Sequence, residues 1–255
     1  MNKATRFRNN IPFFYDKSDL EMKQDPYENY EVSVKKQVLL HLADEAWNTY
    51  PFLSILNYIH EQLDETEHKN IVELGCGVGR MIGEIAEKLP SSTCWGIDYS
   101  YQMLKQAYDS FVQGKILDID FRDFGFKPKV KAVKHSLNNL GFGLAKAEVL
   151  PFENNSVDFV FSSFGIDRFE APEDALLEMY RILKKQGKAV IVSPLNFVKK
   201  EHWEMFYPVE KLISVVEQIG FRIDDFQNDF IVEEPFDARG NKKKWKCVAL
   251  VLAKC

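Results

Sequence analysis

The sequence predicts an α/β protein with a doubly wound, mostly parallel sheet and helices on both faces. Two observations carry this prediction. An apolar run at 71–74 is followed by Gly75, Gly77 and Gly79 and then by an amphipathic segment at 81–89, the pattern of strand, turn and helix. Further apolar runs and helical patterns alternate through the rest of the chain, an order typical of parallel sheets.

Length and composition favour one globular domain with a small appendage. The 255 residues are 45% hydrophobic and carry a formal net charge of −5, which argues against a nucleic-acid binder held by bulk electrostatics. No apolar run approaches the roughly 18 residues that span a bilayer, and the N-terminus lacks a signal-peptide pattern. The four cysteines lack metal-ligand spacing. We therefore expect a cytoplasmic monomer or homodimer with no metal, nucleic-acid partner or membrane partner.

Residues 1–66 are expected to form a helical segment packed on the α/β domain. Apolar residues at helical spacing predict one helix over 27–42 and another from Pro51 through Leu63. A polar link at 64–67 leads into the first core strand. We divide the chain into an N-terminal helical cap, 1–66, and a main domain, 67–255.

The glycine turn indicates a ligand that touches the main chain. Glycine permits positive φ and close approach of a ligand, and the following helix directs free N–H groups toward an anionic group. A second strand at 93–98 ends in Asp98, about 20 residues past the glycines, where a βαβ unit places an acid against ribose hydroxyls. The alternative is a tight turn and an unrelated surface aspartate.

The pattern Glu73-x-Gly75-x-Gly77-x-Gly79 narrows the class of nucleoside ligand. A Gly-Lys-Ser/Thr phosphate loop is missing, which argues against ATP or GTP hydrolysis, and the third glycine of the dinucleotide fingerprint is missing, which disfavours an NAD-dependent oxidoreductase. The pattern instead resembles the first motif of class I S-adenosylmethionine-dependent methyltransferases.

Two further segments support this resemblance. Residues 144–164 resemble the second motif of the small-molecule methyltransferases typified by the ubiquinone-biosynthesis family (methyltransferase type 11), although Lys146 replaces the usual acid. Residues 181–192 match the same family, and the two long strands expected at 221–234 and 245–253 fit its seven-stranded, Rossmann-like sheet. In such enzymes an N-terminal segment commonly covers the ligand, so the cap is a candidate lid.

The resemblance implies S-adenosylmethionine as cofactor and assigns roles within its site. Glu73 is expected to hold the methionine ammonium, Asp98 both ribose hydroxyls, and Ser163 the border of the sulfonium. The full set of implied cofactor-binding residues is Glu73, Gly75, Cys76, Gly77, Gly79, Asp98, Tyr99, Met103, Ala147, Glu148, Ser163 and Phe164.

A weaker resemblance points to the methyl acceptor. The segment 114–143, Ile166-Asp167-Arg168 and the C-terminal pattern are similar to the ovothiol-pathway mercaptohistidine N-methyltransferase domain, which implies a histidine-like or zwitterionic small molecule. The insertion 114–143 is expected to form either an extra hairpin near the substrate or a decorated sheet edge. The substrate candidates are Tyr15, Tyr27, Tyr30, Arg168, Asn196 and Arg239.

The expected reaction is methyl transfer to a small molecule, with a ring nitrogen as one acceptor. A neutral imidazole offers its lone pair near pH 7, so an obligatory base is not required. Asp167 could orient a substrate N–H and Arg168 could clamp a carboxylate, or the two could simply pair with each other. Packing roles are the alternative for the three tyrosines and the preferred role for His41. A catalytically inactive S-adenosylmethionine-fold module that binds another protein is the alternative function.

Overall fold

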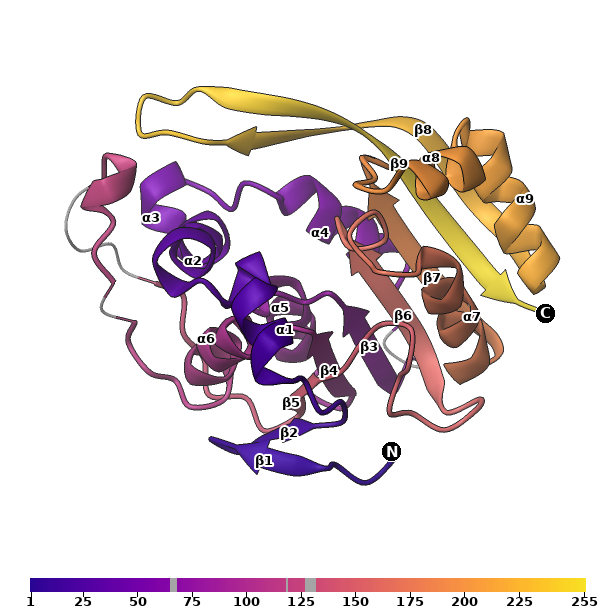
Figure 1. The fold of residues 1–255 in the computed structure, drawn as a ribbon, viewed down its shortest axis with the longest axis horizontal. Helices are drawn as coiled ribbons and strands as arrows, with labels where there is room; N and C mark the ends of the chain where they lie inside the picture. Colours follow the sequence, from indigo (N-terminus) through magenta and orange to yellow (C-terminus); the bar gives the residue numbers. More distant parts are fainter. Residues whose placement is uncertain (65–67, 118, 127–131) are drawn as a thin grey trace.

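The computed structural model describes residues 1–64, 68–117, 119–126 and 132–255, and its centre is one mixed sheet (Figure 1). The described strands lie in the order β1-β2-β5-β4-β3-β6-β7-β9-β8, with five parallel and three antiparallel neighbouring pairs. They are β1 Arg6–Arg8, β2 Ile11–Phe13, β3 Asn70–Leu74, β4 Thr93–Asp98, β5 Leu140–Leu144, β6 Val157–Ser163, β7 Leu183–Ser193, β8 Phe221–Pro235 and β9 Lys242–Lys254. The predicted mostly parallel α/β sheet is confirmed.

Helices cover both faces of this sheet. The α-helices are α1 Asp19–Gln24, α2 Lys35–Leu42, α3 Asp44–Trp47, α4 Leu53–Glu61, α5 Arg80–Lys88, α6 Tyr101–Phe111, α7 Pro172–Ile182, α8 Lys200–Phe206 and α9 Val209–Ile219. Short 3₁₀ and π segments are η1 Pro26–Glu28, η2 Tyr30–Val34 and η3 Arg122–Phe124. Within the described residues, no helix combines the length and apolar character that a membrane crossing requires.

The two faces carry two separate hydrophobic cores. Successive residues of a strand point to opposite faces, so Ile71 of β3 joins the core under α2, α4, α5 and α6, while Val72 joins the core under α7 and α9. Because both faces of the central strands are buried, these strands appear in the sequence as continuous apolar runs. This packing is the doubly wound arrangement that the sequence predicts.

The prediction of seven strands was wrong, because the described sheet has nine. The two extra strands are the hairpin β1–β2, in which β2 extends the sheet by pairing in parallel with β5. Asn9 and Asn10 form its turn with φ angles of 48° and 63°, a conformation that asparagine tolerates better than most residues. The N-terminal segment is therefore not purely helical: its first ordered element is a hairpin with buried Ile11 and Phe13.

The insertion 114–143 contains no strand before Leu140 among its described residues, and residues 118 and 127–131 lie outside the description. The expected extra hairpin is not found in the described part. The segment ends in β5, a strand that the sequence analysis did not predict. Gly141 and Gly143 hide this strand from sequence patterns, and they are there because an added Cβ would lie 2.9 Å from Trp95 and 2.8 Å from Phe14.

The C-terminal strands form a long antiparallel arm that runs past the sheet and over the N-terminal helices (Figure 1). The Tyr58 hydroxyl of α4 donates a hydrogen bond to Asp225 of β8 at 2.8 Å. Lys36 of α2 forms an ion pair with Glu234 at 3.5 Å. The two predicted terminal strands are confirmed, and their arm fixes the N-terminal helices beside the carboxyl ends of β3, β4 and β6.

Candidate active site

The glycine turn and the strand-end acid face each other at the carboxyl ends of β3 and β4. Gly75, Gly77 and Gly79 have φ angles of 70°, 52° and 78°, which residues with a Cβ rarely adopt. The Asp98 carboxylate accepts hydrogen bonds from the backbone N–H groups of Gly77 and Ser100, each at 2.8 Å. The turn and the acid are therefore adjacent, and each carboxylate oxygen keeps a lone pair for a further donor.

The three glycines meet different surroundings. A Cβ on Gly77 would meet nothing within 4 Å, so open space borders the turn there. A Cβ on Gly79 would lie 2.8 Å from both Ala107 and Phe142, so this glycine allows α5 to pack against α6 and β5. Gly77 is therefore the position where a ligand can approach the main chain, and Gly79 serves packing.

Two acids lie near this turn: Glu73, which is buried, and Asp98, which is partly buried. Glu73 accepts a hydrogen bond from the N–H of Ile82 at 3.0 Å, and burial raises the pKa of Glu73 well above its usual range. Burial also raises the pKa of Asp98 to about 6, against the opposing effect of its bonds from Ser100 and Gly77. Hydrogen-bond donors or a cation from a ligand would stabilise the ionised form of both carboxylates.

The N-terminal segment covers Asp98 through a buried lysine. Lys17 is fully buried, and its Nζ donates to Asp25 at 2.6 Å, to Glu28 at 3.0 Å and to the Tyr99 carbonyl at 3.0 Å. The ammonium also lies 4.0 Å from the centre of the Tyr99 ring. These contacts tie the segment around α1 and η1 to the residue that follows Asp98.

Two of the three tyrosine candidates, Tyr15 and Tyr27, contact residues that lie next to Asp98 in the sequence or in the structure. The hydroxyls of Tyr15 and Tyr99 both donate to Glu21, at 2.9 and 2.8 Å. The Tyr27 carbonyl accepts a hydrogen bond from Ser100 Oγ at 2.8 Å. Tyr15 and Tyr30 both pack against the hydrophobic core. A lid role for Tyr15 and Tyr27 remains a prediction.

The remaining cofactor candidates differ in their surroundings. Met103 is buried, and its N–H donates to Ser100 Oγ at 3.2 Å. Cys76 is buried, which raises its pKa well above the usual range and keeps the thiol protonated. Ala147 is buried, while Lys146 forms an ion pair with Glu170 at 2.8 Å and lies 4.8 Å from the Tyr15 ring. Lys146 occupies the sequence position of the usual acid, but its ammonium lies beside the rings of Tyr15 and Tyr99.

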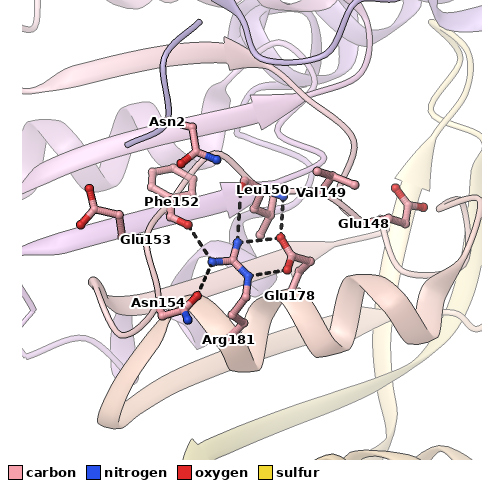
Figure 2. A pocket seen from close by; sticks show the side chains of 9 residues that line it. All are labelled: Asn2, Glu148, Val149, Leu150, Phe152, Glu153, Asn154, Glu178 and Arg181. Carbon is pink, nitrogen blue, oxygen red and sulfur yellow. Dashed lines mark hydrogen bonds and ion pairs between the residues drawn. The ribbon is translucent and has the colours of Figure 1, made fainter.

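Glu148 borders a polar hollow that includes neither the glycine turn nor Asp98 (Figure 2). Its carboxylate accepts a hydrogen bond from the Ala171 N–H at 3.0 Å. In the centre of the hollow, the Arg181 guanidinium donates to Glu178 and to the carbonyls of Leu150 and Phe152 (Figure 2). Arg181 thus holds the loop before β6 in place, and the polar groups of this hollow serve the structure of that loop.

The carboxyl end of β6 brings Ser163 and Phe164 toward α5 and the arm. Ser163 Oγ lies 3.3 Å from Met81 Sδ on the first turn of α5. Phe164 has a φ of 54°, an unfavourable conformation for a bulky residue. Its ring contacts Trp245 of β9 at a centroid distance of 5.8 Å. Both candidates thus lie where the turn, the N-terminal helices and the arm converge.

Asp167 is a buried acid with an incompletely satisfied carboxylate. Ser193 Oγ donates to its Oδ1 at 2.9 Å, whereas Oδ2 is buried without a hydrogen-bond partner among the described residues. Arg168 Nε lies 3.7 Å from Oδ2, which is an ion-pair distance rather than a hydrogen bond. Burial raises the pKa of Asp167, and Arg168 opposes the rise. The two residues therefore pair only loosely.

The last two substrate candidates lie in different places. Asn196 follows Ser193 closely, and its backbone N–H lowers the pKa of Asp167. Arg239 is exposed in the turn between β8 and β9, where the neighbouring Ala238 lies close to Gly125. Figure 1 shows this turn at the far end of the arm. The structure does not bring Arg239 to the other candidates. The described residues also contain no cluster of three potential metal ligands.

The sequence analysis missed Lys17, Glu21 and Glu28. Glu28 accepts the N–H groups of Tyr101 and Gln102, at 2.9 and 3.2 Å, and so caps α6 beside Asp98. A local signal for this region was present: Ser18 and Glu21 form a capping box that starts α1. The buried position of Lys17 depends on tertiary contacts that no local pattern encodes.

Comparisons with known proteins agree with this geometry. Residues 72–191 match the family described as a methyltransferase domain. The chain is 29% identical over 173 residues to a ubiquinone/menaquinone biosynthesis C-methyltransferase of Geotalea daltonii, covering 65% of this chain and 63% of that protein. It is 27% identical over 163 residues to a malonyl-[acyl-carrier protein] O-methyltransferase of Marinomonas sp., covering 62% and 52%. The aligned part thus spans between half and two thirds of these relatives.

A solved methyltransferase from Haloferax volcanii, in complex with the activator Trm112, has a similar fold. Its TM-score is 0.56 at 15% identity, covering 90% of this chain and 98% of that one. At this identity the likeness concerns the fold. The sequence match identifies residues 72–191 as a methyltransferase domain of the class I S-adenosylmethionine-dependent kind, with S-adenosylmethionine as its cofactor, and the similar fold agrees with this.

Proposed function

We propose that this protein transfers a methyl group from S-adenosylmethionine to a small molecule. The observation that carries the proposal is the pairing of Gly77 with Asp98: the turn borders open space, and the acid presents spare acceptor positions beside it. Ribose hydroxyls are donors that suit such an acid. Glu73 would face the ammonium group of the same cofactor.

The chain's own residues would bind and align the reactants. The bound cofactor supplies a methyl group on a sulfonium, and the leaving thioether is neutral, so a general acid is unnecessary. Alignment of a nucleophile behind the methyl can lower the barrier by roughly 7–11 kcal/mol. Ser163 and Phe164 at the end of β6, with the cap over Asp98, would exclude water from this line.

For the acceptor we propose a histidine-like or other zwitterionic small molecule. Two adjacent residues support this choice: the Asp167 oxygen that has no hydrogen-bond donor suits a substrate N–H, and the half-exposed Arg168 suits a carboxylate. The reported relatives carry names of C- and O-methyltransferases, so a ring nitrogen as acceptor rests on this pair of residues alone.

The first test is calorimetry with S-adenosylmethionine and with its demethylated product. We expect both to bind at tens of micromolar or tighter. Absence of binding would refute the enzyme proposal and favour the inactive module that binds another protein.

The second test is methyl transfer from labelled S-adenosylmethionine to a panel of acceptors, including L-histidine, its thiol derivative, histamine and a demethylated quinol. Transfer to a histidine-like amino acid, reduced in Asp167→Asn but not in Asp224→Asn, is the expected result. Transfer to the quinol alone would refute the acceptor class and leave the methyltransferase activity standing.

A further inference from the structure

Four aromatic rings form a continuous row beside the end of β6. The His41 ring of α2 stacks on Phe52 at a centroid distance of 4.8 Å and an angle of 9°. Phe52 meets the edge of Phe164 at 6.0 Å, and Phe164 meets Trp245 at 5.8 Å. The rings come from the N-terminal helices, the central sheet and the C-terminal arm, so the complete fold is needed to assemble them.

The positions of Phe164 and Trp245 are specified independently of one another. Phe164 has a φ of 54°, a conformation that glycine adopts at lower cost than phenylalanine, and it directly follows Ser163. The Trp245 indole N–H donates to Glu234 at 2.8 Å, which fixes the plane of the ring. Phe164, Trp245 and His41 are only partly buried, whereas Phe52 is buried, so both ends of the row keep some accessible surface.

His41 is held in one orientation at the end of this row. Its Nδ1 lies 2.9 Å from the Tyr50 hydroxyl, and the Tyr50 ring lies beneath the Arg80 guanidinium at 4.5 Å. Burial and Arg80 lower the pKa of His41 to about 3, so the imidazole is neutral at physiological pH. Burial raises the pKa of Tyr50 well above its usual range, so the phenol keeps its proton. A phenol that donates to Nδ1 leaves the N–H on Nε2.

We propose that the row of rings is the acceptor subsite, that it takes a planar ring, and that His41 Nε2–H donates a hydrogen bond to an oxygen substituent of that ring. This inference rests on the proposed methyltransferase function and adds a specificity-determining residue. The stacked Phe52 and the bonded Tyr50 prevent the imidazole from turning, so the donor direction is fixed. The sequence analysis favoured a packing role for His41, which a hydrophobic ring would fill equally well.

The test uses two small planar probes, imidazole-4-carboxylate and imidazole, added to protein saturated with the demethylated cofactor. The two share a ring, and only the first carries oxygens. Calorimetry on wild type, His41→Phe and His41→Gln separates a hydrogen bond from packing, because phenylalanine keeps the stack and glutamine can place an N–H near Nε2. The nitrogen NMR signals of His41 give a second readout.

We expect His41→Phe to bind imidazole-4-carboxylate about five- to tenfold more weakly and imidazole unchanged, with partial rescue in His41→Gln. We also expect one Nε2–H tautomer between pH 5 and 8, with Nε2 shifting on addition of the carboxylate probe. Equal binding of both probes to all three proteins, or no binding of either ring at millimolar concentration, would overturn the proposal. Loss of binding of the demethylated cofactor itself would instead count against the proposed function.

Discussion

Replacement of Asp98 by asparagine tests the centre of the proposed cofactor site. The carboxylate is partly buried and accepts two backbone N–H groups, and in the proposed site its spare lone pairs would accept two ribose hydroxyls. Hydrogen bonds to a charged group contribute about 1.5–3 kcal/mol each. Asparagine replaces one acceptor oxygen by an NH2 donor and leaves the other uncharged, so we expect a loss of about 3 kcal/mol, or roughly a hundredfold in affinity. We expect Asp98→Asn to weaken S-adenosylmethionine binding at least that much in calorimetry at pH 7.5.

The pH dependence of wild type provides an independent check of the same reasoning. The pKa of Asp98 rises from 3.8 to about 6 through burial, which corresponds to about 3 kcal/mol for burying the ionised form. Because the folded-state pKa is raised, this group costs nothing below pH 4, and stability falls as the pH rises from about 4 to 6. Hydroxyl donors favour the ionised carboxylate, so cofactor affinity should increase through about pH 6.

Two measurements would refute this account of Asp98. The first is binding by Asp98→Asn within threefold of wild type, with the surface variant Asp224→Asn as the matched control. The second is a cofactor affinity in wild type that stays constant between pH 5 and 8. Denaturant unfolding of the ligand-free variant should also lose the decline in stability between pH 4 and 6.

Three further variants probe other parts of the structure. Gly77→Ala should lower cofactor affinity at least tenfold in calorimetry, while Gly79→Ala should mainly lower unfolding free energy by about 1–3 kcal/mol, since only the latter adds a Cβ 2.8 Å from neighbours. Reversed effects would contradict the roles given to the two glycines. Lys17→Met should destabilise the segment around α1 by about 3 kcal/mol, seen as faster proteolysis within residues 15–30, because it leaves two partly buried carboxylates without their cation; unchanged proteolysis would contradict this. Asp167→Asn should leave cofactor affinity within twofold and lower kcat/KM for the acceptor at least tenfold, and a loss confined to cofactor binding would exclude an acceptor role.

The elements that sequence patterns predicted best are those whose causes are local. The strand at 70–74, its glycine turn and the strand ending at Asp98 lie within 29 residues, and each shows its structure through contiguous residues. Buried parallel strands must be apolar on both faces, so this part of the sheet is visible in the sequence. The cofactor side of the candidate site follows from these elements.

Other elements depend on contacts between distant residues, and sequence patterns missed them. β1 and β2 have three residues each, too short for a periodic signal. β5 contains two glycines, which weaken its strand signal in the sequence. Glycine is required there because Trp95 of β4 and Phe14 of the N-terminal segment leave no room for a Cβ. The helix expected over 27–42 is split into η1, η2 and α2, because Glu28 and the Tyr27 carbonyl are used to hold the start of α6.

The same contacts limit how the N-terminal segment can act as a lid. β2 pairs with β5, and Phe13 is fully buried in the core, so residues up to 13 cannot leave without breaking the sheet. α2 and α4 contribute Val38 and Ile55 to that core and lie under the C-terminal arm. The intervening segment around α1 and η1 has no buried side chain in either helix and is held chiefly by polar contacts such as those of Lys17. Any opening over Asp98 therefore involves residues between about 15 and 30, not the whole of 1–66, and Lys17 is the contact whose loss should release them.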